Sequence, residues 1–195
     1  MNVFLPIMLV LMGTSSTVAG PLHDAAKNGD LKLARQLLDQ GTNPTDFDSS
    51  GEPALLIASL AGHADIVAFL LDKGVSVESR NKGGLTALHA AAYAGNLDVV
   101  KLLVSKKAPV NDDKNFYHMS PLHAAAEEGH AEVVAFLLAN KADIEAKERN
   151  GYTPVTQAGW RSHWEAADLL LKAGAVCQAA DIVGEPLYNE CLKRK

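Results

Sequence analysis

A segment of about 33 residues recurs five times in this chain, and no other feature limits its possible folds so strongly. The copies align without internal gaps, and their first residues are spaced by 33, 33, 34 and 33 positions. They begin at Pro21, Ala54, Ala87, Pro121 and Pro154. A fixed period of this length is typical of proteins in which one supersecondary unit stacks on the next. The chain therefore predicts an elongated stack of units.

Each copy predicts two short helices. In the fourth copy Ser120 can accept a backbone N–H as a helix cap, and Pro121 suits the first helical position. Gly129 then ends the first helix in a conformation that glycine adopts at little cost. The second helix carries apolar residues at helical spacing, namely Val133, Val134, Phe136, Leu137 and Leu138. Because one unit cannot bury this apolar face alone, its neighbours must supply the core.

These motifs resemble the ankyrin repeat, whose pattern is roughly G-x-T-P-L-H-x-A-A-x-x-G-H-x-x-x-V-x-L-L-L-x-x-G-A-D. The resemblance covers Gly20 to about Gly184 as five units. It implies an all-α solenoid of stacked helix-turn-helix units joined by β-turn or hairpin loops. The segment from Asp181 to Lys195 starts the pattern again and stops after one helix, so we expect a half-repeat that caps the stack. The predicted ankyrin-repeat domain is residues 20–195.

A few positions depart from the family pattern. Lys107 and Lys141 replace the glycine that follows the second helix, and Ser162 replaces the one that follows the first. The fifth copy has Val155 and Thr156 where the pattern has Leu-His. These changes are expected to weaken individual turns and to leave the fold intact.

Residues 1–19 precede the repeats and carry no charged side chain. The run from Val3 to Met12 is apolar, falls short of the ~20 residues that a membrane-spanning helix needs, and is followed by small polar residues. We expect a signal peptide cleaved after Ala19 and a periplasmic or secreted mature protein, of bacterial type, that does not insert into a membrane. An uncleaved anchor or a disordered apolar leader is the alternative.

Three histidines recur at one position of the first helix: His23, His89 and His123. The resemblance implies a structural role, in which each imidazole bonds backbone groups and ties one turn to the next. As metal ligands they would lie one repeat apart, roughly 10 Å, which is too far for a single ion. A second column beside the turn between helices contains His63, His130 and His163.

Motifs for catalysis are missing from the sequence. It has no HExxH, no paired CxxC, no glycine-rich phosphate loop and no GxSxG elbow. We therefore predict no catalytic residue, no metal and no cofactor; a hydrolase or cofactor protein that uses the scattered histidines is a competing hypothesis. The formal charge of −5, with basic residues clustered only in the terminal KRK, argues against nucleic-acid binding.

The two cysteines fall near the C-terminal end of the predicted stack. Cys177 aligns with Val110 and Ile144 of earlier copies, and Cys191 lies 33 residues after Ala158. The two positions could therefore face each other. We expect a disulfide if the protein is exported, and two buried free thiols are the alternative.

Two positions after the paired alanines predict a binding surface on the concave side of the stack. The first reads Lys27, Leu60, Tyr93, Glu127 and Trp160 along the repeats. The second reads Asn28, Ala61, Ala94, Glu128 and Arg161. We expect Leu60, Tyr93 and Trp160 to be exposed apolar anchors. Charged neighbours would flank them, namely Glu127, Glu128 and Arg161.

The longer third connection supplies a second candidate surface. It has one extra residue and places Phe116 and Tyr117 where other connections have polar residues and glycine. An insertion at a repeat turn often maps to the binding face. Repacking of these two rings over the neighbouring turn is the alternative.

Together these features predict a monomeric module that binds another protein and has no chemistry of its own. Families resembling this one act as scaffolds, inhibitors or accessory factors of a partner. An intracellular adaptor or host-directed effector, which would keep residues 1–19, is a competing hypothesis.

Overall fold

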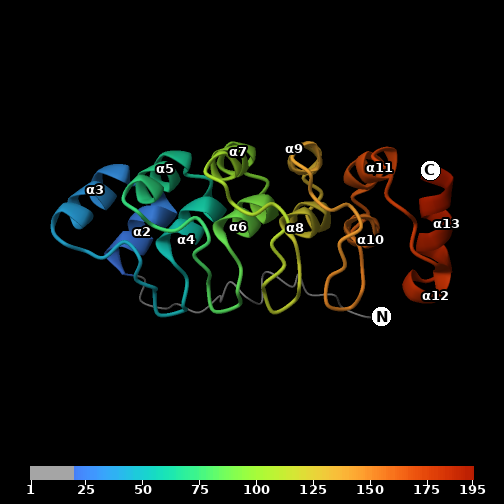
Figure 1. Cartoon of the computed structure of the whole chain (residues 1–195), viewed down its shortest axis with the longest axis horizontal. Coiled ribbons are helices and arrows are strands. Elements are labelled where there is room, and N and C mark those ends of the chain that lie inside the picture. The colour runs from blue at the N-terminus through green and yellow to red at the C-terminus, as the bar shows by residue number, and fades with distance from the viewer. Residues whose placement is uncertain (1–19) are drawn as a thin grey trace.

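The computed structural model describes residues 20–195, so the predicted signal peptide lies outside the described residues. Within that range the chain forms five consecutive helix pairs, two terminal helices and no strand longer than an isolated bridge (Figure 1). The pairs are α2 (Pro21–Asn28) with α3 (Leu31–Asp39), α4 (Ala54–Ala61) with α5 (Ala64–Asp72), α6 (Ala87–Ala94) with α7 (Leu97–Ser105), α8 (Pro121–Glu127) with α9 (Ala131–Ala139), and α10 (Pro154–Trp160) with α11 (Trp164–Lys172). The terminal helices are α12 (Ala180–Val183) and α13 (Glu185–Arg194). The predicted all-α repeat solenoid is confirmed.

The paired helices form two rows along the stack. Figure 1 shows α3, α5, α7, α9 and α11 in an upper row, α2, α4, α6, α8 and α10 below them, and the connecting loops beneath. Each helix packs against its partner and against the equivalent helices of the adjacent pairs. We call the lower row the inner helices and the upper row the outer helices. The core is therefore continuous along the molecule.

A buried leucine occupies the same place in the inner helix of four repeats. These residues are Leu22, Leu55, Leu88 and Leu122, each at most 2% exposed. In the fifth repeat Val155 takes this place and is 4% exposed. Full burial of such a side chain contributes about 2 kcal/mol. The departure at Val155 therefore changes the residue without opening the core.

His89 ties the third repeat to the turn that follows it. Its Nδ1 accepts hydrogen bonds from the Thr86 N–H at 3.2 Å and the Thr86 hydroxyl at 2.8 Å. Its Nε2 donates to the carbonyl oxygens of Met119 at 2.9 Å and Asp112 at 3.1 Å. One ring nitrogen accepts and the other donates, which describes a neutral imidazole. Burial lowers the pKa of His89 and so maintains this form.

His123 repeats the arrangement in the fourth repeat. Ser120 supplies the hydroxyl at 2.8 Å, and the His123 Nε2 donates to the Tyr152 carbonyl at 3.1 Å. Burial lowers the pKa of His123 to about 4. The Nδ1 atom of His23 is buried without a partner among the described residues, because its cap position holds Gly20 and a glycine has no hydroxyl.

In the second histidine column, His63 and His130 each join the start of an outer helix to the inner helix of the preceding repeat. The His63 Nε2 lies 3.1 Å from the carbonyl oxygen of Lys27, and the His130 Nε2 lies 2.8 Å from that of Tyr93. These carbonyls belong to the C-terminal turns of inner helices, where backbone acceptors lack helical partners. At Gly95, with φ 73°, a Cβ atom would collide with the His130 ring. Glycine is thus needed there for both conformation and space.

The C-terminal helices close the stack differently from a simple half-repeat. Cys177 and Cys191 form a disulfide that holds α13 to the segment after α11. Helix α13 contacts α10, and Arg194 near its end lies 4.4 Å from the ring centroid of Trp164 and 3.3 Å from the Asp168 carboxylate, both on α11. One helix therefore covers the ends of both rows. Arg194 links α13 to α11, because its long side chain stacks on the Trp164 indole while its guanidinium pairs with the Asp168 carboxylate.

Candidate functional site

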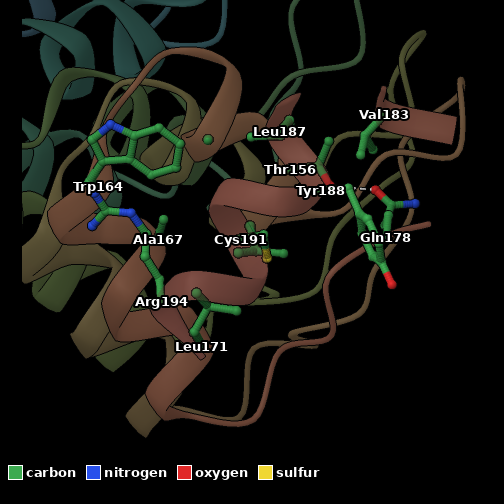
Figure 2. A pocket seen from close by; sticks show the side chains of 12 residues that line it. Thr156, Trp164, Ala167, Leu171, Gln178, Val183, Leu187, Tyr188, Cys191 and Arg194 are labelled. Atoms are coloured by element: carbon green, nitrogen blue, oxygen red, sulfur yellow. Dashed lines mark hydrogen bonds between the residues drawn. The ribbon is translucent and has the colours of Figure 1, made fainter. Parts of the chain in front are cut away.

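A small crevice lies between α10, α11 and the C-terminal helices. Its volume is about 10 Å³, which is the space needed by roughly one water molecule. Figure 2 shows Trp164 and Arg194 at one end of it and Thr156 hydrogen-bonded to Gln178 at the other. The remaining lining is mostly apolar and includes Cys191. The crevice is a packing gap under the cap and is too small for a substrate.

Side chains of the types that bind metal ions are scattered over the described residues. Within residues 20–195 no three side chains of histidine, cysteine, aspartate or glutamate come together in a way that could hold an ion. In the same range no helix has the length and apolar character to cross a membrane.

The predicted anchor column lies at the C-terminal ends of the inner helices. Leu60, Tyr93 and Trp160 are each half-buried, which is less open than the exposed anchors that the sequence predicted. Lys27, at the first position of the column, is exposed. We call these residues together with Glu127 the inner-helix column. The stacking of equivalent positions brings residues one repeat apart side by side.

Trp160 is partly covered by a residue of the preceding loop. Its ring centroid lies 4.2 Å from that of Tyr152, and the planes meet edge to face at 79°. Such aromatic pairs contribute about 0.5–1.5 kcal/mol beyond the area that they bury. The pair fixes the indole at the end of α10, so replacement of Trp160 affects stability as well as the surface.

Glu127 does not belong to the exposed charged rim that the sequence predicted. It is buried at 2% exposure, whereas Glu128 and Arg161 are partly exposed. The Arg161 Nη2 donates to the Glu127 Oε1 at 2.7 Å across one repeat. Burial raises the pKa of Glu127, and the Arg161 guanidinium opposes the rise. The sequence pattern placed this residue correctly in the column but could not show that it faces inward.

Tyr93 lies next to this ion pair. Burial raises the pKa of its hydroxyl group, and the charges of Glu128 and Glu127 raise it further. Tyr93 and Glu127 are equivalent residues of adjacent inner helices, α6 and α8, which pack directly on each other.

An aromatic cluster occupies the tip of the third loop. Phe116 is 61% exposed, and its ring meets that of Tyr117 edge to face with centroids 4.9 Å apart. The Arg149 guanidinium lies 4.6 Å from the Phe116 ring centroid. The Arg149 N–H also donates to the Tyr117 carbonyl at 2.8 Å. Tyr117 is thus packed between turns, while Phe116 keeps most of its surface open.

Arg149, Tyr152 and Phe47 were not predicted from the sequence. Phe47 lies on the first loop and is 58% exposed. Arg149 stands 33 residues after Phe116, so the repeat period itself was the signal that these two side chains would be neighbours. Tyr152 lies 8 residues before Trp160, far from the repeat period, so no pattern along the chain links the two.

Comparison with known proteins places these features in a family. The family model described as ankyrin repeats, in three copies, matches residues 22–114 and 107–181. Osteoclast-stimulating factor 1 from Gallus gallus is 40% identical over 53 residues, which are 27% of this chain and 26% of that protein. The protein of the same name from Rattus norvegicus is 42% identical over 53 residues, or 27% of this chain and 25% of its own length. The chain therefore matches about a quarter of the length of these relatives.

Proposed function

Because this chain belongs to the ankyrin-repeat family, we propose that it is a protein-binding module whose inner-helix column and loop tips capture one partner protein. The observation that carries the proposal is the pair of aromatic sites on one molecule, Tyr93 with Trp160 and Phe116 with Arg149. Large rings and arginine are the side chains that contribute most to protein interfaces. In this proposal the chain acts without catalysis, as a monomeric scaffold, inhibitor or accessory factor.

Site-specific photocrosslinking tests where the partner binds. A photoreactive phenylalanine analogue at Tyr93 is expected to crosslink a partner in the native compartment. The same analogue at Phe136, a half-buried residue of outer helix α9, is expected to crosslink none. Equal crosslinking from both positions would show that the inner helices are not the binding surface.

A double substitution tests the energetic role of the anchors. Tyr93→Ala with Trp160→Ala is expected to weaken partner capture by about 100-fold or more, since each anchor of an interface contributes about 2 kcal/mol. Phe136→Ala is the matched control, and it also removes a half-buried ring. Some loss of thermal stability is expected from the lost contact with Tyr152, so capture is measured on folded protein at a temperature well below both transitions. Capture that survives the double substitution would refute the proposal.

We further propose that the chain works outside the cytosol after cleavage at Ala19. The Cys177–Cys191 disulfide supports this, since such bonds persist mainly in oxidising compartments. Intact-mass analysis of the native protein is expected to find a chain that begins at Gly20 and takes up an alkylating reagent only after reduction. A full-length mass with two free thiols would instead support the adaptor or effector hypothesis.

A further inference from the structure

Basic side chains that are far apart in the sequence gather at the tips of three successive loops. The second, third and fourth loops lie next to one another beneath the inner helices (Figure 1). Lys82, Phe116 and Arg149 hold one equivalent position of these loops, and Lys114 and Lys147 hold another, two residues earlier. We call these five residues the tip surface. Only stacking brings them together, so no basic run marks this surface in the sequence.

Backbone hydrogen bonds hold the three loops in a fixed order. At each junction the residue at the first of these positions donates its N–H to a carbonyl oxygen of the loop before: Lys82 to Gly51 at 3.3 Å, Phe116 to Gly83 at 3.0 Å, and Arg149 to Tyr117 at 2.8 Å. The side chains at this position therefore follow one another along the edge of the stack. A partner that binds them does not have to order the loops first.

The four cations of the tip surface have no acidic partner. Lys82, Lys114, Lys147 and Arg149 are exposed, and none of them forms an ion pair with another residue of the range 20–195. Three other arginines of the chain do pair with carboxylates, namely Arg80, Arg161 and Arg194. The tip surface thus keeps its positive charges free for a ligand.

The charge of these tips is opposite to that of the whole chain. Residues 82–84, 113–118 and 146–151 contain the four cations and two carboxylates, Asp113 and Glu148, so they carry +2 on a chain of −5. Glu148 is only 3% exposed, and its carboxylate accepts the N–H groups of Asn150 at 2.8 Å and Tyr152 at 3.2 Å. It is occupied within its own loop. Charge complementarity therefore points to an anionic partner.

The stacked pair of Phe116 and Arg149 offers two kinds of contact side by side. The Arg149 guanidinium lies 4.6 Å from the ring centroid, and the ring is 61% exposed. Stacking uses the flat face of a guanidinium, whereas its N–H donors point outward in the plane and match the two oxygens of a carboxylate. Arg149 can thus bind a carboxylate while the exposed ring receives an apolar side chain beside it.

We propose that the tip surface binds an acidic segment of the partner protein. Carboxylates of this segment pair with Arg149 and the three lysines, and one apolar side chain packs on Phe116. This inference rests on the proposed function and specifies the chemistry of the partner. An acidic protein segment fits better than a nucleic acid, because nucleic-acid binding depends on a larger basic surface than four cations on a negatively charged chain.

A peptide titration followed by NMR tests this inference. The probe is a peptide with blocked ends in which one leucine stands between two runs of three glutamates. The reference probe has glutamine in place of every glutamate, which keeps the shape and removes the charge. The glutamate peptide is expected to give saturable shifts at the amides of Lys82, Phe116 and Arg149. The glutamine peptide is expected to bind about tenfold more weakly or worse, since opposite charges contribute most of the attraction.

A matched pair of variants separates the site from general charge effects. Arg35 on α3 is exposed and lies 4.6 Å from the Phe69 ring centroid, so it has the same stacked geometry as Arg149 at another place on the stack. Arg149→Gln is expected to weaken binding of the glutamate peptide about tenfold, and Arg35→Gln to change it less than about twofold. Circular dichroism checks that both variants fold, as their exposed positions lead us to expect.

Several outcomes would overturn the inference. These are equal losses in the two variants, equal binding of the two peptides, no saturable shift at the three amides, or tighter binding of a thymidine oligonucleotide than of the glutamate peptide. Partner capture separates this inference from the proposed function. If capture is lost in the Tyr93/Trp160 double variant but kept when Lys114, Lys147 and Arg149 are all changed to glutamine, the proposed function stands and this inference fails. If neither set of changes affects capture, both fail.

Discussion

At the scale of single residues, the second repeat has Leu56 at the position of the linking histidine, and a different pair of side chains joins its loops. Glu52, only 8% exposed, accepts hydrogen bonds from the Asn81 amide at 3.1 and 3.2 Å. The Asn81 Oδ1 in turn accepts from the Leu85 N–H at 2.8 Å. These bonds join the first loop to the second, as His89 and His123 do for later loops. A buried carboxylate in this role makes the link depend on pH.

Replacement of Glu52 by glutamine should remove that dependence. Burial raises the pKa of Glu52 to about 7 from 4.5, and the nearby charge of Asp48 also raises it. The stability that Glu52 contributes is therefore complete below about pH 4.5 and is lost as the pH rises through about 7. Glu52→Gln should be more stable than the parent at about pH 8, by on the order of 2 kcal/mol, and the gain should shrink toward about pH 5.

Urea denaturation at several pH values measures this difference. The comparison with the parent matters, because His89 and His123 act in the opposite direction. Burial lowers their pKa values, so their contribution is lost as the pH falls. A gain that is the same at every pH would show that Glu52 does not titrate in this range.

At the scale of the helix, the ends of the outer helices keep one geometry whatever residue occupies them. Glycines follow three of these helices, with φ of 90° at Gly41, 89° at Gly74 and 107° at Gly174. Lys107 and Lys141 take the same place with φ of 69° and 66°. The backbone bond that closes each end is retained, as in the 3.0 Å bonds from Ala108 to Leu103 and from Ala142 to Leu137. Packing of the next loop imposes the conformation, and the lysines adopt it at a cost.

Glycine at these two helix ends should stabilise the protein. A left-handed conformation costs an L-residue about 1–2 kcal/mol, and glycine loses about 0.5–1 kcal/mol more chain entropy on folding. Lys107→Gly and Lys141→Gly should therefore each raise the free energy of unfolding by up to about 1 kcal/mol, as measured by urea denaturation.

Lys106→Gly is the control, because its φ is −85° and its ion pair with Asp72 is exposed. It should destabilise the protein. A gain at this position as well would mean that strain is not the cause.

At the scale of the whole molecule, stability is a property of contacts between neighbouring repeats. Each inner helix packs on the inner helices before and after it, and contacts between distant repeats do not build the core. Such a stack behaves as a one-dimensional series, in which an end unit has one neighbour and a middle unit has two. The cap restores the missing neighbour at the C-terminal end.

One substitution made at two equivalent positions should reveal this behaviour. Leu22 and Leu122 occupy the same place in the motif Pro-Leu-His and are both buried. Leucine to alanine at a buried site costs about 2–5 kcal/mol. Leu22→Ala should free α2 and α3 locally, whereas Leu122→Ala should lower the stability of the whole stack. Hydrogen exchange measured by mass spectrometry distinguishes the two, and equal effects along the chain would contradict a one-dimensional stack.

Several parts of the candidate site followed from the repeat period, because residues one period apart become neighbours in a stack. This holds for the column through Tyr93 and Trp160, and for the histidines that link turns. The repeat period did not predict which side chains of the column would be buried. Glu127 and Glu128 are adjacent in sequence and equally charged, yet only the first faces inward.

The sequence by itself determined the architecture, because five copies of one apolar pattern can be buried only by stacking. The tertiary structure alone decided which polar side chains are buried and which partners they bind. Glu127 meets Arg161 from 34 residues away, Glu52 meets Asn81 from 29, and Arg194 reaches α11 from the cap. The physical reason is that such pairs depend on where long side chains end in space, and a pattern of residue types along the chain carries no information on that.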